Sequence, residues 1–115
     1  SVSEREDGDV FTADFDECIV YHLYSSLKFK NKIDFSQYKK NIKVIRSICA
    51  LEDSLIICVR GKSQVLKTTY SGKIISPFVL KNVDWCNPVK ISKSSDNTLY
   101  ISDKENDRII NIKIL

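Results

Sequence analysis

The chain has 115 residues, of which 43% are apolar and 29% charged, and its formal net charge is +3 at pH 7. This length fits one domain and this composition fits a globular protein, so a wholly disordered chain is excluded. The longest purely apolar run, residues 55–59, is too short to cross a membrane, and we expect no membrane partner.

Charge is distributed unevenly along the chain. Residues 1–17 contain seven acidic side chains and one basic side chain, whereas residues 18–115 contain 17 basic and eight acidic ones. We expect residues 1–17 to be an acidic, partly disordered lead-in that is solvated or shields a basic site. The chain begins at Ser1 and contains no Met, so we expect a segment of a larger protein.

Short strands separated by polar turns dominate from Cys18 onward. The predicted strands cover residues 18–23, 27–31, 43–51, 55–59, 64–69, 73–76 and 98–103, and residues 32–42 form a loop or one helical turn. Because the connections have the length of hairpin turns, the sequence predicts an all-β protein built as an antiparallel meander.

An internal repeat with an offset of 44 residues is the strongest pattern in the sequence. It aligns Leu55 with Leu99, and Ile45 with Val89. This period is typical of the four-stranded blade of a β-propeller. The chain would then hold two to three blades of a partial β-propeller, and we expect the rest of a larger propeller, or self-association, to close the ring. The two repeat units cover about residues 44–76 and 88–115.

The second unit carries a family resemblance. Pro88 precedes a strand, residues 99–103 alternate apolar and polar side chains up to an Asp, and Arg108 and Ile109 open the next strand. This arrangement resembles the NHL repeat of six-bladed β-propellers. The resemblance implies a non-catalytic binding module whose loops hold a protein or RNA partner. The alternatives are part of a metal-dependent propeller hydrolase and a subunit that completes a ring by self-assembly.

Several residues of this unit are expected to have structural roles. Asp103 ends one strand and Arg108 begins the next, so the two side chains can form a charge-assisted hydrogen bond across the turn. Trp85 is expected to anchor the preceding loop in the blade. The side chains expected to pack between blades are Leu99, Ile101, Ile109 and Ile110.

Residues 28–46 form a basic segment with interleaved aromatic residues. Basic side chains contact phosphates and aromatic rings stack on bases, so this pattern is typical of single-stranded nucleic-acid binding. An edge strand with a solvated lysine face gives the same pattern. The candidate binding residues, for nucleic acid or an acidic partner, are Lys28, Lys30, Lys32, Phe35, Tyr38, Lys39, Lys40, Lys43 and Arg46.

The sequence offers little for catalysis or metal binding. His22 is the single histidine, the three glycines are isolated, and the four cysteines form no C-x-x-C pair. We therefore assign no catalytic residue, metal or cofactor, and expect His22 to be a partnered structural residue. Cys49 and Cys58 lie in apolar segments and are expected to be buried free thiols of a cytoplasmic protein; pairing of all four cysteines would indicate secretion.

Overall fold

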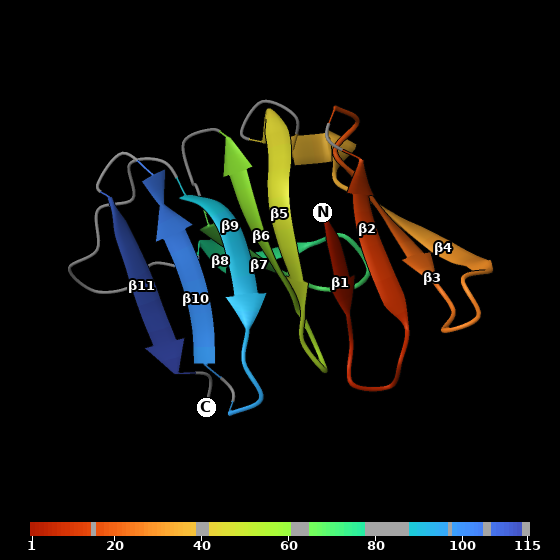
Figure 1. Ribbon diagram of the computed structural model, residues 1–115. Helices are drawn as coiled ribbons and strands as arrows, with labels where there is room; N and C mark the ends of the chain where they lie inside the picture. The colour runs from red at the N-terminus through yellow and green to blue at the C-terminus, as the bar shows by residue number, and fades with distance from the viewer. Residues whose placement is uncertain are drawn as a thin grey trace.

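Three antiparallel sheets follow one another along the chain in the computed structural model (Figure 1). The structure describes residues 1–14, 16–38, 42–60, 65–77, 88–96, 98–104 and 107–113. Sheet 1 contains β1 (Val2–Glu4), β2 (Val10–Asp14), β3 (Ile19–Leu23) and β4 (Phe29–Asp34). Sheet 2 contains β5 (Val44–Ala50), β6 (Leu55–Arg60), β7 (Val65–Thr68) and β8 (Ile74–Pro77). Sheet 3 contains β9 (Pro88–Lys93), β10 (Thr98–Asp103) and β11 (Arg108–Lys113).

Each sheet is a meander in which every strand pairs with the next one in the chain. A single turn of 3-10 helix, η1 (Ser36–Tyr38), lies between β4 and β5. The predicted all-β fold of antiparallel meanders is therefore confirmed. The Cα radius of gyration of 13.3 Å equals the value of about 13 Å expected for one globular domain of this length.

Sheet 2 lies between the other two sheets because both of its faces are apolar (Figure 1). In β6, Leu55 and Ile57 belong to the core shared with sheet 1, whereas Ile56 and Cys58 belong to the core shared with sheet 3. All four side chains are fully buried. Successive residues of a strand point to opposite faces, so a strand covered on both sides needs the continuous apolar run that the sequence shows here.

The two cores draw on all three sheets. The core between sheets 1 and 2 includes Phe11, Val20, Ile33, Phe35, Ile45, Ile48, Leu55, Ile57 and Leu66. The core between sheets 2 and 3 includes Cys49, Ile56, Cys58, Val65, Ile91, Leu99, Ile101 and Ile112. The prediction that Ile109 packs between blades is wrong, since Ile109 is 69% exposed. The side chain of its neighbour Ile110 packs against the core between sheets 2 and 3.

The prediction of a partly disordered acidic lead-in over residues 1–17 is also wrong. These residues contain β1 and β2, and Ser3 pairs with Phe11 across them. Phe11 is fully buried in the core between sheets 1 and 2. The acidic side chains do not prevent this order because Asp7 and Asp9 are bonded to Arg5 in the turn between the two strands.

Serine hydroxyls join the first strands of successive sheets. Each accepts a hydrogen bond from a backbone N–H that points away from the ladder of its own sheet. The pairs are Ser1 with Ile48 (3.2 Å), Ser3 with Ala50 (2.9 Å) and Ser47 with Ile91 (3.1 Å). The strands β1, β5 and β9 therefore lie side by side.

Cys49 and Cys58 are buried free thiols, which confirms their prediction. Burial raises the pKa of the Cys49 thiol to about 11 and that of Cys58 to about 12. Both thiols are therefore protonated at neutral pH and behave as small apolar side chains. Cys86 lies outside the described residues.

Candidate functional site

The predicted basic segment is exposed along β4, the edge strand of sheet 1. Lys28, Lys30 and Lys32 are all exposed. Lys43 is also exposed, but it follows η1 at the far end of β4, and Arg46 is half-buried in β5. Lys39 and Lys40 lie outside the described residues. The structure thus brings three of the predicted basic residues together on one strand and its turn.

The two aromatic residues predicted to stack on bases are not on this surface. Phe35 is fully buried in the core between sheets 1 and 2, and Tyr38 packs against that core. The Tyr38 hydroxyl accepts a hydrogen bond from the backbone N–H of Ile74 (3.4 Å). Their prediction as base-stacking residues is therefore wrong, because the chain turns inward at η1, directly after β4.

Other large apolar side chains are exposed beside these lysines, and none of them is among the predicted binding residues. Tyr24 is 47% exposed, Leu27 is 65% exposed and Phe29 is 62% exposed. All three belong to the turn between β3 and β4 or to the residues that flank it. We call residues 24–30 the β3–β4 tip. Their alternation with lysine is visible in the sequence, but their exposure depends on where the hairpin projects.

A carboxylate connects the β3–β4 tip to the turn between β1 and β2. Asp9 Oδ2 lies 2.8 Å from His22 Nε2, 3.3 Å from the Arg5 guanidinium and 3.5 Å from Lys30 Nζ. The His22 ring stacks on Phe11 with 4.2 Å between ring centroids. The prediction that His22 is a partnered structural residue is confirmed.

Arg5 organises the other side of this turn. Its guanidinium donates to both carboxylate oxygens of Asp7, at 3.0 and 2.7 Å. It also lies over the ring of Tyr70, 4.9 Å from the centroid. The Tyr70 hydroxyl donates to the carbonyl of Leu51, and burial raises the pKa of Tyr70 to about 12. The turn is therefore attached to sheet 2 through a tyrosine that stays protonated.

Acidification is expected to weaken this turn below about pH 4. Hydrogen bonding to Arg5 lowers the pKa of Asp7 from 3.8 to about 2, and His22 is the main cause of the lowered pKa of Asp9. A carboxylate with a depressed pKa stabilises the fold above its unfolded-state pKa, and that contribution is lost as the pH falls through the folded-state pKa. We expect the free energy of unfolding, measured by urea titration, to decline between about pH 4 and pH 2.

Asp7→Asn should flatten this decline because it removes the titrating carboxylate. Glu6→Gln, at an exposed position in the same turn, is the matched control and should leave the decline unchanged. An equally steep decline in Asp7→Asn would contradict the assignment.

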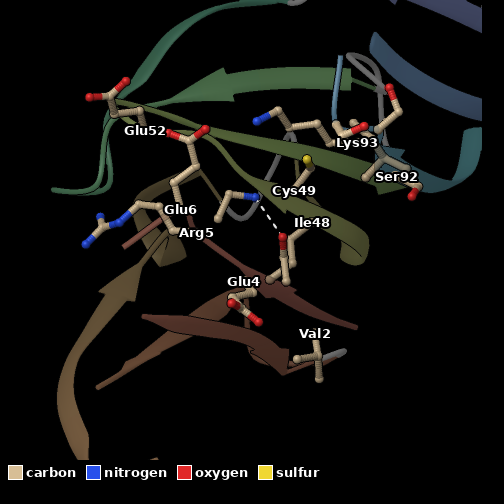
Figure 2. A pocket seen from close by; sticks show the side chains of 14 residues that line it. Val2, Glu4, Arg5, Glu6, Ile48, Cys49, Glu52, Ser92 and Lys93 are labelled. Carbon is tan, nitrogen blue, oxygen red and sulfur yellow. Dashed lines mark hydrogen bonds between the residues drawn. The ribbon is translucent and has the colours of Figure 1, made fainter. Parts of the chain in front are cut away.

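A pocket of about 410 Å³ lies where the first strands of the three sheets meet. Figure 2 shows Glu4, Glu6 and Glu52 on one side of it and Lys93 with Ser92 on the other. The dashed line in the figure is the hydrogen bond from the backbone N–H of Ala50 to the Ser3 hydroxyl. Three carboxylates and two cationic side chains, Arg5 and Lys93, line the pocket, so one negative charge is left over.

The predicted ion pair between Asp103 and Arg108 is present at the turn between β10 and β11. Arg108 donates to Asp103 Oδ2 through Nε (3.1 Å) and through a terminal nitrogen (2.9 Å). Asp103 is fully buried, whereas the Arg108 side chain is 37% exposed. The pair fixes the end of the hairpin. Trp85 lies outside the described residues, so its predicted role as an anchor stays a prediction.

Comparison with known proteins finds no family model and no curated protein that matches this chain. Within the described ranges, no group of three or more His, Cys, Asp or Glu side chains is placed to hold a metal ion. No helix among these residues is long and apolar enough to cross a membrane.

Proposed function

We propose that the chain forms three blades of a β-propeller with NHL-like repeats. The second strands of the three sheets support this reading, because apolar residues that are buried, or half-buried in the case of Ala13, recur every 44 residues. The two series are Phe11, Leu55 and Leu99, and Ala13, Ile57 and Ile101. Each member lies opposite a residue of the third strand of its own sheet, and the register is the same in sheets 2 and 3.

Matching irregularities in the first strands give a second argument. The pairing of β5 with β6 skips one residue between Ile45 and Ser47, and the pairing of β9 with β10 skips one between Pro88 and Lys90. Bulges of this kind are specific features of a fold. They align Ile45 with Pro88, one residue away from the sequence alignment on Val89. The shift arises because Ala50 pairs with Leu55 five positions later, whereas Lys93 pairs with Leu99 six positions later.

A ring would continue from the outer faces of sheets 1 and 3. Val2 on β1 is 70% exposed, and Tyr100 on β10 is 40% exposed. Further sheets, from a longer chain or from other copies, would cover these faces as sheet 2 is covered here. The absolute mass of the purified chain in solution distinguishes the two sources.

We further propose that this assembly is a non-catalytic binding module for an anionic partner. The observation that supports it is the exposed row of Lys28, Lys30 and Lys32 on the edge of sheet 1. The partner expected from the sequence is RNA or an acidic protein. With Phe35 buried and Tyr38 half-buried against the core, stacking on RNA bases would fall to Phe29 and Tyr24, both exposed beside the lysines. A cytoplasmic location stays a prediction.

Salt dependence of binding to a fluorescent oligouridine is the direct test. Each phosphate contact contributes a slope of roughly −0.7 to log K against log salt for single strands. We expect measurable binding at low salt, and the triple variant Lys28→Gln, Lys30→Gln, Lys32→Gln should reduce the slope by about 2. The matched control replaces three exposed lysines of sheet 3, Lys90, Lys104 and Lys113, and changes the net charge equally.

Two results would contradict the proposal. One is that the chain binds neither oligouridine nor heparin at low salt. The other is an equal loss of binding in the two triple variants, which would show a response to net charge alone. For the metal-dependent hydrolase considered from the sequence, none of the described residues supplies a favouring observation, and we do not propose it.

A further inference from the structure

Three hairpin turns in this protein have the same backbone hydrogen bonds. In each, the first residue accepts from the N–H of the fourth and donates to the carbonyl of the fifth. The turns run from Arg5 to Asp9, from Tyr24 to Lys28 and from Thr69 to Lys73. The fourth residue of such a turn has a positive φ, for which glycine is the favoured residue.

Two of the three turns have glycine at this position and the third has leucine. Gly8 and Gly72 have φ values of +92° and +93°, and Leu27 has a φ of +68°. Leu27 and Gly72 occupy the same connection, from third to fourth strand, in sheets 1 and 2. A left-handed backbone is unfavourable for a branched aliphatic residue. Core packing does not compensate for it, since Leu27 is 65% exposed.

The neighbours of Leu27 extend this exposed apolar surface. Tyr24 and Phe29 are exposed beside it, Lys28 and Lys30 flank Phe29 along the chain, and Lys30 Nζ lies over the Tyr24 ring. Figure 1 shows the β3–β4 hairpin projecting at the outer edge of sheet 1, away from sheets 2 and 3. The β3–β4 tip is thus a convex turn with apolar side chains at its end and cationic side chains next to them.

We propose that the β3–β4 tip contacts the surface of an anionic lipid bilayer. This inference rests on the proposed function and names the partner of the same basic edge. Exposed aromatic and aliphatic side chains enter the interface, while flanking lysines contact anionic headgroups. RNA bases would stack on the aromatic rings, but RNA offers no apolar phase into which Leu27 inserts. The expectation of no membrane partner considered only spanning segments, and a peripheral contact requires none.

Vesicle sedimentation tests this proposal with the whole chain. We expect binding to vesicles of phosphatidylcholine mixed with phosphatidylserine, weaker binding at high salt, and little binding to phosphatidylcholine alone. Leu27→Gly should weaken vesicle binding by about tenfold or more. The same substitution should raise the thermal unfolding midpoint, since glycine suits the positive φ. Loss of binding could then not be attributed to unfolding.

The matched control is Ile109→Thr, which removes a side chain of similar exposure from β11 and should leave vesicle binding unchanged. Binding to oligouridine without binding to vesicles would overturn the membrane assignment and leave the proposed function intact. Equal vesicle binding by Leu27→Gly and the unmodified chain would exclude the β3–β4 tip as the membrane contact. Failure to bind vesicles, oligouridine and heparin alike would overturn both proposals.

Discussion

Ile56→Ala is expected to lower the free energy of unfolding by about 2 to 4 kcal/mol. Ile56 is fully buried on the face of sheet 2 that packs against sheet 3. Truncation to alanine removes three carbons from a core that cannot fully collapse, so a cavity remains. Ile57→Ala should cost a similar amount through the core between sheets 1 and 2, where Ile57 is equally buried. Urea unfolding monitored by circular dichroism measures both changes.

The matched control for these variants is Ile109→Ala, the same substitution at a position that is 69% exposed. It should change stability by less than about 1 kcal/mol. If the three sheets unfold as one unit, both core variants will shift a single transition. Two separate transitions in Ile56→Ala alone would show that sheet 3 dissociates independently. A loss below about 1 kcal/mol in either core variant would contradict the packing described here.

Arg108→Gln is expected to destabilise the protein by about 3 kcal/mol. Arg108 donates two hydrogen bonds to the fully buried carboxylate of Asp103. Removing one partner of a buried ion pair leaves a charge in a site of low polarity. The value lies at the lower end of the range for such pairs because the arginine side chain is 37% exposed to water. Thermal and urea denaturation give the measurement.

Lys104→Gln is the control for this substitution, since Lys104 is an exposed base in the same turn. It should have little effect. The double variant with Asp103→Asn removes the stranded charge together with its partner, so its loss should be smaller than the sum of the two single losses. Additive losses would show that the two side chains do not stabilise each other.

Local sequence patterns predicted the strands and their hairpin connections wherever neighbouring residues alone determine them. The apolar run of residues 55–59 indicated a buried strand, and the short polar turns indicated a meander. The first 17 residues were misread because their composition is acidic. Strand β1 has only three residues, and its order depends on pairing with β2 and on serine contacts with β5. None of these long-range partners is visible locally.

The candidate site was predictable only in part. Lysine alternation identified the solvated edge of β4 correctly, since Lys28, Lys30 and Lys32 are exposed. The same alternation could not show that Phe35, one residue past the strand, turns into the core. The positive φ of Leu27 could not be predicted either, because leucine rarely adopts this backbone conformation.

The three serine hydroxyls that join the sheets also bear on how the protein avoids aggregation. An edge strand with free N–H groups is a template on which a strand of another molecule can assemble. On β5 and β9, the N–H groups of Ile48, Ala50 and Ile91 are already occupied by serine oxygens. A serine side chain ends the ladder, whereas a paired backbone would extend it. These N–H groups of β5 and β9 are therefore closed to intermolecular strand addition, and on the outer edge of sheet 1 the lysines of β4 oppose it by charge repulsion.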